Sequence, residues 1–64
     1  MNKEDIINKT GLIYKNGWPI AALQVTEDCI IYVDSRKDFR LPVSKLDYML
    51  SVIEANGTTI EFDQ

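Results

Sequence analysis

The side chains of this 64-residue chain that are able to do chemistry are carboxylates, amines, hydroxyls and one thiol, because histidine is absent. Histidine is the group that most often moves protons near neutral pH, and a carboxylate or lysine replaces it only where a water-excluding cleft shifts its pKa. The acids of this sequence lie at polar turns, at helix starts or on the wet side of an alternating strand. We therefore expect a protein that is not an enzyme, and we assign no catalytic residue.

The sequence also gives no reason to expect a metal or a cofactor. The segment Asp34–Asp38 holds two carboxylates, but it contains two cations and lacks both the glycine and the distal glutamate of a calcium loop. Cys29 is the only cysteine, which excludes an intrachain disulfide and a Cys/His zinc site, and we expect it to be a small buried side chain. The three glycines are isolated from one another, so no phosphate-binding loop is present and no small-molecule substrate is expected.

A basic segment runs from Ser35 to Lys45, with four cations against the single acid Asp38. Cations interleaved with aromatic rings are typical of RNA or single-strand binding, in which phosphates meet lysine or arginine while bases stack on the rings. A net charge of −3 and a pI near 4.6 act against phosphate binding, and turn charges and a core ring explain the same residues. The residues of this nucleic-acid-binding alternative are Arg36, Lys37, Phe39, Arg40 and Lys45.

An acidic segment follows, because the residues after Lys45 include four carboxylates and no cation. If the expected helix and final strand lie side by side, these acids share one end of the domain. Small acidic proteins can occupy a groove built for nucleic acid by presenting carboxylates where phosphates otherwise bind, although ordinary solvation explains the same charges. The acids that we expect at a protein-binding surface are Asp47, Glu54, Glu61 and Asp63.

Two aromatic side chains flank the tight turn predicted at Asn16-Gly17. Trp18 follows the turn and Tyr14 lies on the partnering strand, so we expect an aromatic pair on the exposed side of the hairpin, with burial of Trp18 as the alternative. Exposed tryptophan and tyrosine are preferred anchors of interfaces. The segment 18–25 is apolar on both sides of a strand, which favours cover by a helix on one side and by a second subunit on the other. We therefore expect a homodimer.

The first half of the chain predicts a short helix and three strands. A capping residue followed three positions later by an acid predicts a helix from Asn2 to about Lys9, with Ile6 and Ile7 turned inward. Asn-Gly supplies the positive φ angles of a hairpin turn, and a proline at the start of the second strand predicts an edge or a bulge there. The three expected strands are 12–15, 18–25 and 29–34.

The second half predicts a fourth strand, an amphipathic helix and a final strand. Phe39–Leu41 alternates apolar and charged residues and stops at Pro42. Ser44 with Asp47 three residues later forms a capping box, and Val43 is expected to pack on Tyr48 as a hydrophobic staple. The inward helix positions are Leu46, Met49, Leu50 and Ile53, the stop is Asn56-Gly57, and the last strand, Thr58–Phe62, turns Ile60 and Phe62 inward.

The expected architecture is therefore a single α+β domain over residues 1–64. A small antiparallel sheet, a three- to four-stranded meander, packs with a short N-terminal helix and one amphipathic helix, and a final C-terminal strand closes the domain. A chain of this length buries roughly 60% of the surface that its unfolded form exposes, so a second subunit would supplement a thin core. No stretch approaches the ~20 apolar residues of a membrane span, and the expected location is the cytoplasm.

These observations favour a small acidic protein-binding module that inhibits or regulates a larger partner. Short acidic chains without catalytic motifs include phage and mobile-element proteins that block a host nucleic-acid-handling or defence complex, and this is an analogy of size and composition alone. The partner itself, the pathway and the face that binds are left open by the sequence. Nucleic-acid binding through the basic segment 36–45 is the alternative.

Overall fold

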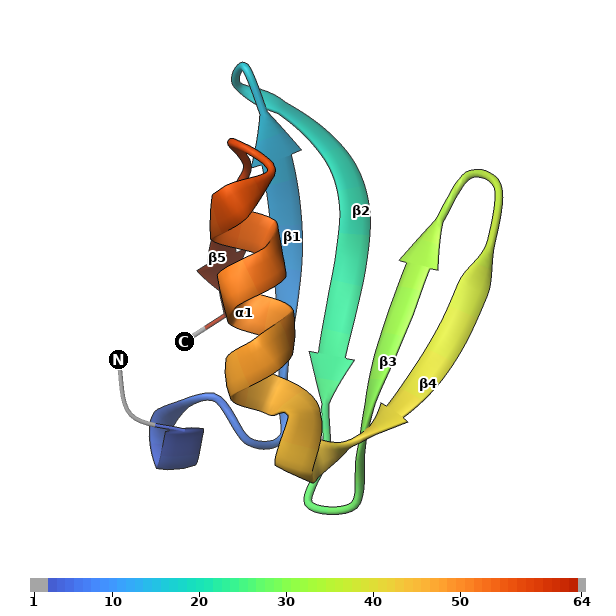
Figure 1. The fold of residues 1–64 in the computed structure, drawn as a ribbon, viewed down its shortest axis with the longest axis vertical. Coiled ribbons are helices and arrows are strands. Elements are labelled where there is room, and N and C mark those ends of the chain that lie inside the picture. The colour runs from blue at the N-terminus through green and yellow to red at the C-terminus, as the bar shows by residue number, and fades with distance from the viewer. Residues whose placement is uncertain (1–2, 64) are drawn as a thin grey trace.

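The protein forms a five-stranded antiparallel sheet with one α-helix packed on one of its faces (Figure 1). A computed structural model describes residues 3–63. The strand order across the sheet is β4-β3-β2-β1-β5, which confirms the α+β class. No helix among the described residues is long and apolar enough to cross a membrane. The elements are η1 (Lys3–Asp5), β1 (Lys9–Lys15), β2 (Trp18–Val25), β3 (Cys29–Asp34), β4 (Asp38–Pro42), η2 (Val43–Lys45), α1 (Leu46–Ala55) and β5 (Thr59–Phe62), where η denotes a 3₁₀ turn.

The final strand is an integral fifth strand of the sheet, which corrects the expected count of three to four. The strands β1 to β4 form the predicted meander, and β5 pairs antiparallel with the free edge of β1. Ile60 lies opposite Ile13, and Phe62 lies opposite Gly11. Ile60 and Phe62 pack against the buried core, as their alternation with Glu61 predicted.

The predicted N-terminal helix is wrong except for its first turn. Asn2 lies outside the described residues, Lys3–Asp5 form a single 3₁₀ turn, and β1 already begins at Lys9. Asn8 adopts a positive φ of 67° and donates its backbone N–H to the Val25 carbonyl over 2.7 Å, which turns the chain into the sheet. A helix of so few residues is marginal on its own, so pairing with β2 prevails. Ile6 is buried as expected, at 2% exposure.

The β1–β2 hairpin forms as predicted, and the second strand contains a bulge. Asn16 and Gly17 have φ angles of 53° and 83°, the positive values that this two-residue turn requires. The register shifts between Ile13, which pairs with Ala21, and Tyr14, which pairs with Pro19, so Ile20 is the extra residue. Pairing of β2 with β3 begins only at Ala21. Pro19 therefore sits beside the bulge and outside the β2–β3 ladder, as a residue without an N–H must.

Lys45, and not the expected Ser44, is the N-cap of α1. Ser44 lies inside the 3₁₀ turn η2, and neither that turn nor α1 has a side-chain hydrogen bond at its N-cap. Pro42 sets the extended backbone before the turn, with φ −63° and ψ 148°, so a proline and a 3₁₀ turn start the helix. Val43 packs against the core, whereas Tyr48 is 64% exposed, so the expected staple does not bury the tyrosine.

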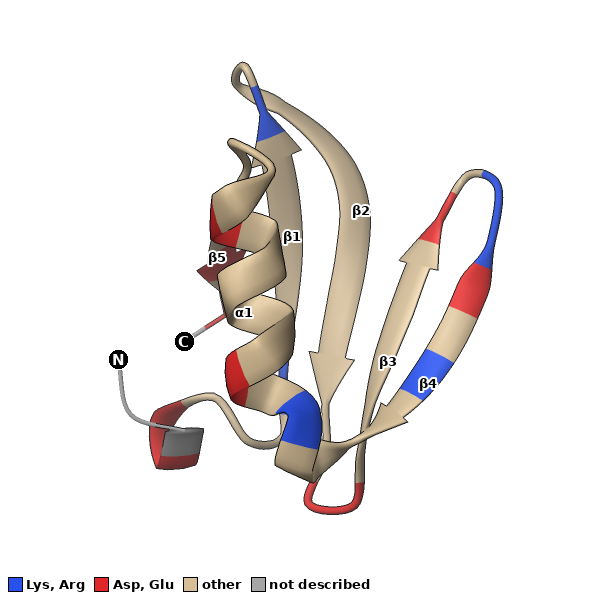
Figure 2. Ribbon diagram, in the orientation of Figure 1, with Lys and Arg blue, Asp and Glu red and all other residues tan. Residues whose placement is uncertain are grey.

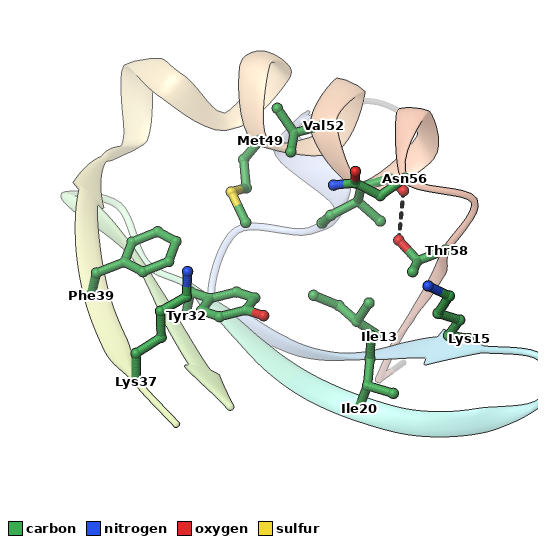
Figure 3. Close-up of a pocket in the computed structure, with 11 residues that line it drawn as sticks. Ile13, Lys15, Ile20, Tyr32, Lys37, Phe39, Met49, Val52, Asn56 and Thr58 are labelled. Carbon is green, nitrogen blue, oxygen red and sulfur yellow. Dashed lines mark hydrogen bonds between the residues drawn. The ribbon is translucent and has the colours of Figure 1, made fainter. Parts of the chain in front are cut away.

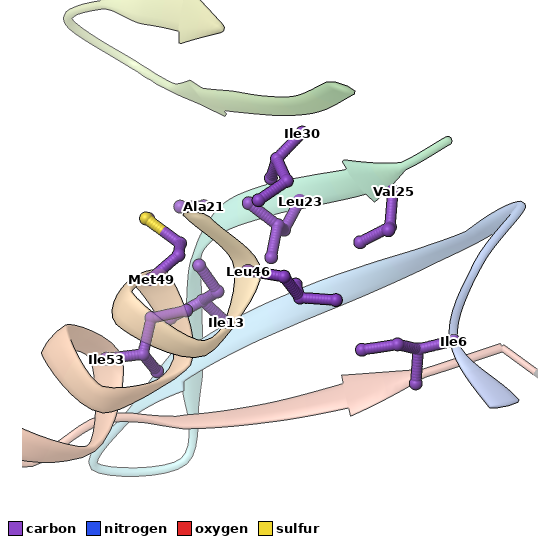
Figure 4. Close-up of a cluster of buried hydrophobic side chains, with 9 residues drawn as sticks. All are labelled: Ile6, Ile13, Ala21, Leu23, Val25, Ile30, Leu46, Met49 and Ile53. Atoms are coloured by element: carbon purple, nitrogen blue, oxygen red, sulfur yellow. The ribbon is translucent and has the colours of Figure 1, made fainter. Parts of the chain in front are cut away.

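The core lies between α1 and the inner face of the sheet (Figure 4). The four largest fully buried side chains are Leu23, Ile30, Leu46 and Val25, and burial of each contributes about 1.5–3 kcal/mol. Helix positions i, i+3 and i+7 supply the inner stripe of α1, as predicted. Among the residues whose burial the structure describes, the buried ones are Ile6, Ile13, Ala21, Leu23, Val25, Ile30, Leu46, Met49 and Ile53.

The close approach of β5 to β1 makes Gly11 a test of the β1–β5 packing. A Cβ at Gly11 would lie 2.9 Å from two carbons of the Phe62 ring and 3.0 Å from Ile60 Cδ1. We expect Gly11→Ala to lower the free energy of unfolding by about 1–3 kcal/mol, measured by urea denaturation. In a Phe62→Ala background the same substitution should cost much less, because the ring is gone. Alanine otherwise favours a strand over glycine, so a gain in stability on Gly11→Ala would contradict this packing.

Candidate protein-binding surfaces

The face of the sheet opposite α1 is open and carries an apolar row. The helical elements of residues 3–63 all send side chains to the same core, Ile6 from the N-terminal turn, Val43 from η2 and Leu46 from α1, so none covers the opposite face. On that face Leu12 pairs with Ala22, and Ala22 pairs with Val33. Leu12 is 45% and Val33 is 46% exposed. We call Leu12, Ala22 and Val33 the open-face row.

A carboxylate borders each end of the open-face row. Glu61 of β5 lies opposite Leu12 at one end, and Asp38 of β4 lies opposite Val33 at the other. Two pairs further along β3, and so on the same face, Arg40 lies opposite Ile31. The β4 edge therefore carries one cation, Arg40, near the apolar row. The charged residues at the β5 edge are both carboxylates, Glu61 and Asp63. Asp63 follows β5 and donates its backbone N–H to the Thr10 carbonyl.

The four acids of the predicted acidic surface lie on the side of the molecule formed by α1 and β5 (Figure 2). Asp47 and Glu54 are seven residues apart on α1 and therefore project from the same side of the helix. Glu61 and Asp63 alternate with the inward Ile60 and Phe62 and therefore belong to the open face. The structure brings the acids to one edge of the sheet but divides them between its two faces.

A groove separates the two pairs of acids. It lies between α1 and β5, has a volume of about 310 Å³, and is apolar apart from Glu54 and two threonines. Because β5 pairs only with β1, the backbone groups on its other side are unpaired within the sheet. The lining residues of the groove are Leu50, Ile53, Glu54, Thr58, Thr59, Ile60 and Phe62.

The basic residues predicted as a nucleic-acid site do not form one surface. Arg36 and Lys37 follow β3 in the β3–β4 turn, while Lys45 lies at the other end of β4, at the start of α1 (Figure 2). Phe39 packs toward the core, so the adjacent Arg40 belongs to the open face. These cations are therefore divided between the two faces of the sheet and between the two ends of β4. A single nucleic-acid strand on one face would not contact all of them.

Phe39 also has one ring face already occupied. Its ring stacks on Tyr32, with centroids 4.7 Å apart and planes inclined by 20°. The ammonium of Lys37 lies over the same ring, 5.7 Å from its centroid. A base could not stack on the face of Phe39 that Tyr32 covers.

Trp18 and Tyr14, predicted as an aromatic pair, lie on opposite faces of the sheet. The two-residue turn pairs Trp18 with Lys15 and Tyr14 with Pro19, and successive residues of a strand point to opposite faces. Tyr14 is half-buried on the open face. Trp18 is 74% exposed on the helix side, so it belongs to the surface rather than the core. The bulge at Ile20 is the reason that Trp18 and Ala22 do not share a face.

A cleft opens between α1 and the β3–β4 hairpin (Figure 3). Its volume is about 340 Å³. The β1–β2 hairpin forms the floor, α1 forms one wall and the stacked pair of Tyr32 and Phe39 forms the other. The residues that line the cleft are Ile13, Lys15, Ile20, Tyr32, Lys37, Phe39, Met49, Val52, Ile53, Asn56 and Thr58.

Asp34 organises the turn at the outer end of this cleft. Its Oδ1 accepts the backbone N–H groups of Arg36 and Lys37 over 2.7 and 2.8 Å, and its Oδ2 accepts the Tyr32 hydroxyl over 2.9 Å. The N–H of Arg36, followed by that of Lys37 and the Tyr32 hydroxyl, holds the pKa of Asp34 below its usual value. Burial, together with the bond to the Asp34 carboxylate and its charge, raises the pKa of Tyr32.

No group of three or more side chains suited to hold a metal ion occurs among the residues described. Cys29 is half-buried, less than expected, with its sulfur 3.5 Å from the Thr26 hydroxyl oxygen. Comparison with protein-family models, with curated proteins and with solved structures gave no match.

Sequence reasoning expected an apolar outer face for segment 18–25, but it missed Leu12 and Val33 beside that strand, and it missed the cleft. A signal for the open-face row was present in the sequence, because β1 and β3 each carry apolar residues on both faces, as at Leu12 beside Ile13 and Val33 near Ile30. The cleft had no such signal. Its residues come from four strands, a helix and two loops, and their meeting depends on how far the helix extends over the sheet.

The turn at Asp34 generates a pH-dependent prediction. We expect Asp34→Ala to lower the free energy of unfolding at neutral pH, and Asp34→Asn, which keeps the Oδ1 acceptor, to lower it less. Because the folded-state pKa of Asp34 lies below its unfolded value, its stabilisation is present above the unfolded pKa of about 3.9 and is lost as pH falls through the folded pKa. Urea unfolding at a series of pH values measures this. A difference between wild type and Asp34→Ala that stays constant down to acid pH would contradict the assignment.

Proposed function

We propose that this chain is a protein-binding module that self-associates through the open face of its sheet and acts on a larger partner as an inhibitor or regulator. The observation that carries the proposal is the open-face row, in which Leu12 and Val33 are each nearly half exposed on either side of Ala22. Contiguous exposed apolar surface with a polar rim marks interaction sites. In the proposed mode of action the chain binds a complementary surface of its partner and catalyses no reaction.

A second copy of the chain is the occupant that we propose for this row. A twofold axis parallel to the strands, through the centre of the open face, lays β4 of one subunit over β5 of the other. Along the strands the register then sets Arg40 of one subunit opposite Asp63 of the other, and this contact occurs twice, whereas Asp38 lies opposite Glu61. The central row contains no charge, so its burial leaves no ion without a partner.

A dimer of this kind leaves the helix side of both subunits free for a larger partner. That side presents Trp18, which is 74% exposed, together with Asp47 and Glu54 on one side of α1. Tryptophan is among the residues most enriched in binding hot spots, and carboxylates steer the encounter with a basic surface. We propose that the partner is a protein with a basic surface and that it belongs to a complex that handles nucleic acid. A cytoplasmic location fits the single cysteine, which has no disulfide partner within the chain.

The dimer proposal predicts that a charge placed in the open-face row dissociates the subunits. We expect wild type to sediment as a dimer at micromolar concentration, and Val33→Lys to sediment as a monomer with a retained circular dichroism spectrum, because the lysine would be desolvated in the interface. Tyr48→Lys is the matched control, since Tyr48 is an exposed apolar side chain on α1, and it should leave the dimer intact. A wild type that is monomeric at every concentration would rule out self-association through this face.

The partner proposal predicts a protein that remains bound when nucleic acid is destroyed. The tagged chain is used to capture its partner from the lysate of its native cell, with nuclease treatment of half the sample and mass spectrometry of both halves. We expect a stoichiometric protein in both halves and its loss with Trp18→Ala, since the ring is 74% exposed and its removal leaves the core intact. Recovery that nuclease abolishes, and that Arg36→Ala with Lys37→Ala weakens, would instead favour the nucleic-acid-binding alternative.

A further inference from the structure

The cleft between α1 and the β3–β4 hairpin is separate from the surface that we assign to self-association. Its lining residues lie on the helix side of the sheet, whereas the open-face row lies on the other side. Its volume of about 340 Å³ falls within the range of small-molecule sites, about 300–1,000 Å³. The cleft would therefore remain open in the proposed dimer.

The body of the cleft is suited to a flat apolar group. Ile13 and Ile20 form its floor, and Met49 and Val52 of α1 form one wall. The opposite wall is the stacked pair of Tyr32 and Phe39 (Figure 3). The Tyr32 hydroxyl is already bonded to Asp34, so that wall offers a planar apolar surface rather than a hydroxyl group. Aromatic rings pack well against such a wall and against the sulfur of a methionine.

The charged groups of the cleft are all positive. Lys15 and Lys37 are its only ionisable lining residues apart from Tyr32, and no carboxylate is among the lining residues. Figure 3 shows Lys37 beside the aromatic wall and Lys15 beside Thr58, on two sides of the opening. The charge of Lys37 acts on Asp34 outside the cleft, and its ammonium lies over Phe39. Two cations at the mouth of an apolar cleft, in a chain of net charge −3, select an anion.

We infer that this cleft binds a small molecule that joins a planar aromatic ring to an anionic group, a carboxylate, sulfonate or phosphate. The ring enters between Met49 and the Tyr32–Phe39 pair, and the anion remains at the mouth between Lys15 and Lys37. The compound is a ligand and not a substrate, because the lining contains no nucleophile paired with a base. A regulator with such a site responds to the concentration of the compound.

Two dyes that share one ring system and differ in charge test the inference. The anionic dye 8-anilinonaphthalene-1-sulfonate and its uncharged counterpart N-phenyl-1-naphthylamine both fluoresce when they enter an apolar site. We expect saturable binding of one anionic dye molecule per chain, tighter than binding of the neutral dye, and weaker at high salt because the lysines are at the mouth of the cleft. Thermal unfolding of the folded chain should shift upward in the presence of the anionic dye.

Substitutions in the cleft separate the roles of charge and shape. Lys15→Met and Lys37→Met should each weaken the anionic dye roughly two- to fivefold, as expected for a partly solvated ion pair, and leave the neutral dye unchanged. Lys45→Met is the matched control, because Lys45 lies at the start of α1 and outside the lining, and it should change neither dye. Val52→Trp, which places a larger side chain in the cleft, should weaken both dyes.

Three outcomes would overturn the inference. Dye binding that Val33→Lys abolishes and the cleft variants do not affect would place the dye on the open face. Equal effects of Lys45→Met and the two cleft lysine variants would indicate general charge attraction. No saturable binding by a wild type whose circular dichroism shows a folded chain would mean that the cleft holds no such ligand. The second and third outcomes do not bear on self-association, which the sedimentation experiment decides separately.

Discussion

The mismatch in width between one α-helix and a five-stranded sheet determines the surfaces of this protein. A helix with its side chains is ~10–12 Å across, whereas the outer strands of five lie ~19 Å apart at a spacing of ~4.8 Å. The helix α1 therefore covers only part of the inner face, and the chain supplies nothing among residues 3–63 for the other face. The cleft beside the β3–β4 hairpin exists because α1 covers only part of the inner face. The open-face row is exposed because no described element covers the other face.

The part of the sheet that α1 does not reach is stabilised by local contacts instead. Tyr32 and Phe39 stack across β3 and β4, so each ring protects the face that a helix would otherwise cover. Asp34 binds the backbone of the turn and the Tyr32 hydroxyl, which joins the turn to the aromatic pair. Lys37 completes the unit by placing its charge over the Phe39 ring. A hairpin that is stabilised in this way can extend beyond the helix and form one wall of a cleft.

Local sequence signals predicted most of the elements, because the residues that decide them are adjacent. Asn16-Gly17 fixes a two-residue turn through its positive φ angles, and the bounds of β3 are those expected from its run of β-branched residues. The errors arose where distant pairing decides. The N-terminal segment joins the sheet because β2 offers a partner, and the bulge at Ile20 moves Trp18 to the other face. The candidate surfaces depend on such pairings. This explains why the predicted acids and cations are all exposed but are not grouped as expected.

The position of β5 has a consequence for how the chain reaches this structure. The meander β1 to β4 forms through short turns, whereas the pairing of Gly11 with Phe62 joins residues that are 51 positions apart. Closing so long a loop costs more chain entropy than closing a hairpin, and topologies with distant pairings fold more slowly. Until α1 has docked and β5 arrives, β1 has an unpaired edge next to apolar side chains. A chain in which β5 has not yet paired therefore presents the seven-residue edge of β1 to other chains, in place of the four-residue edge of β5.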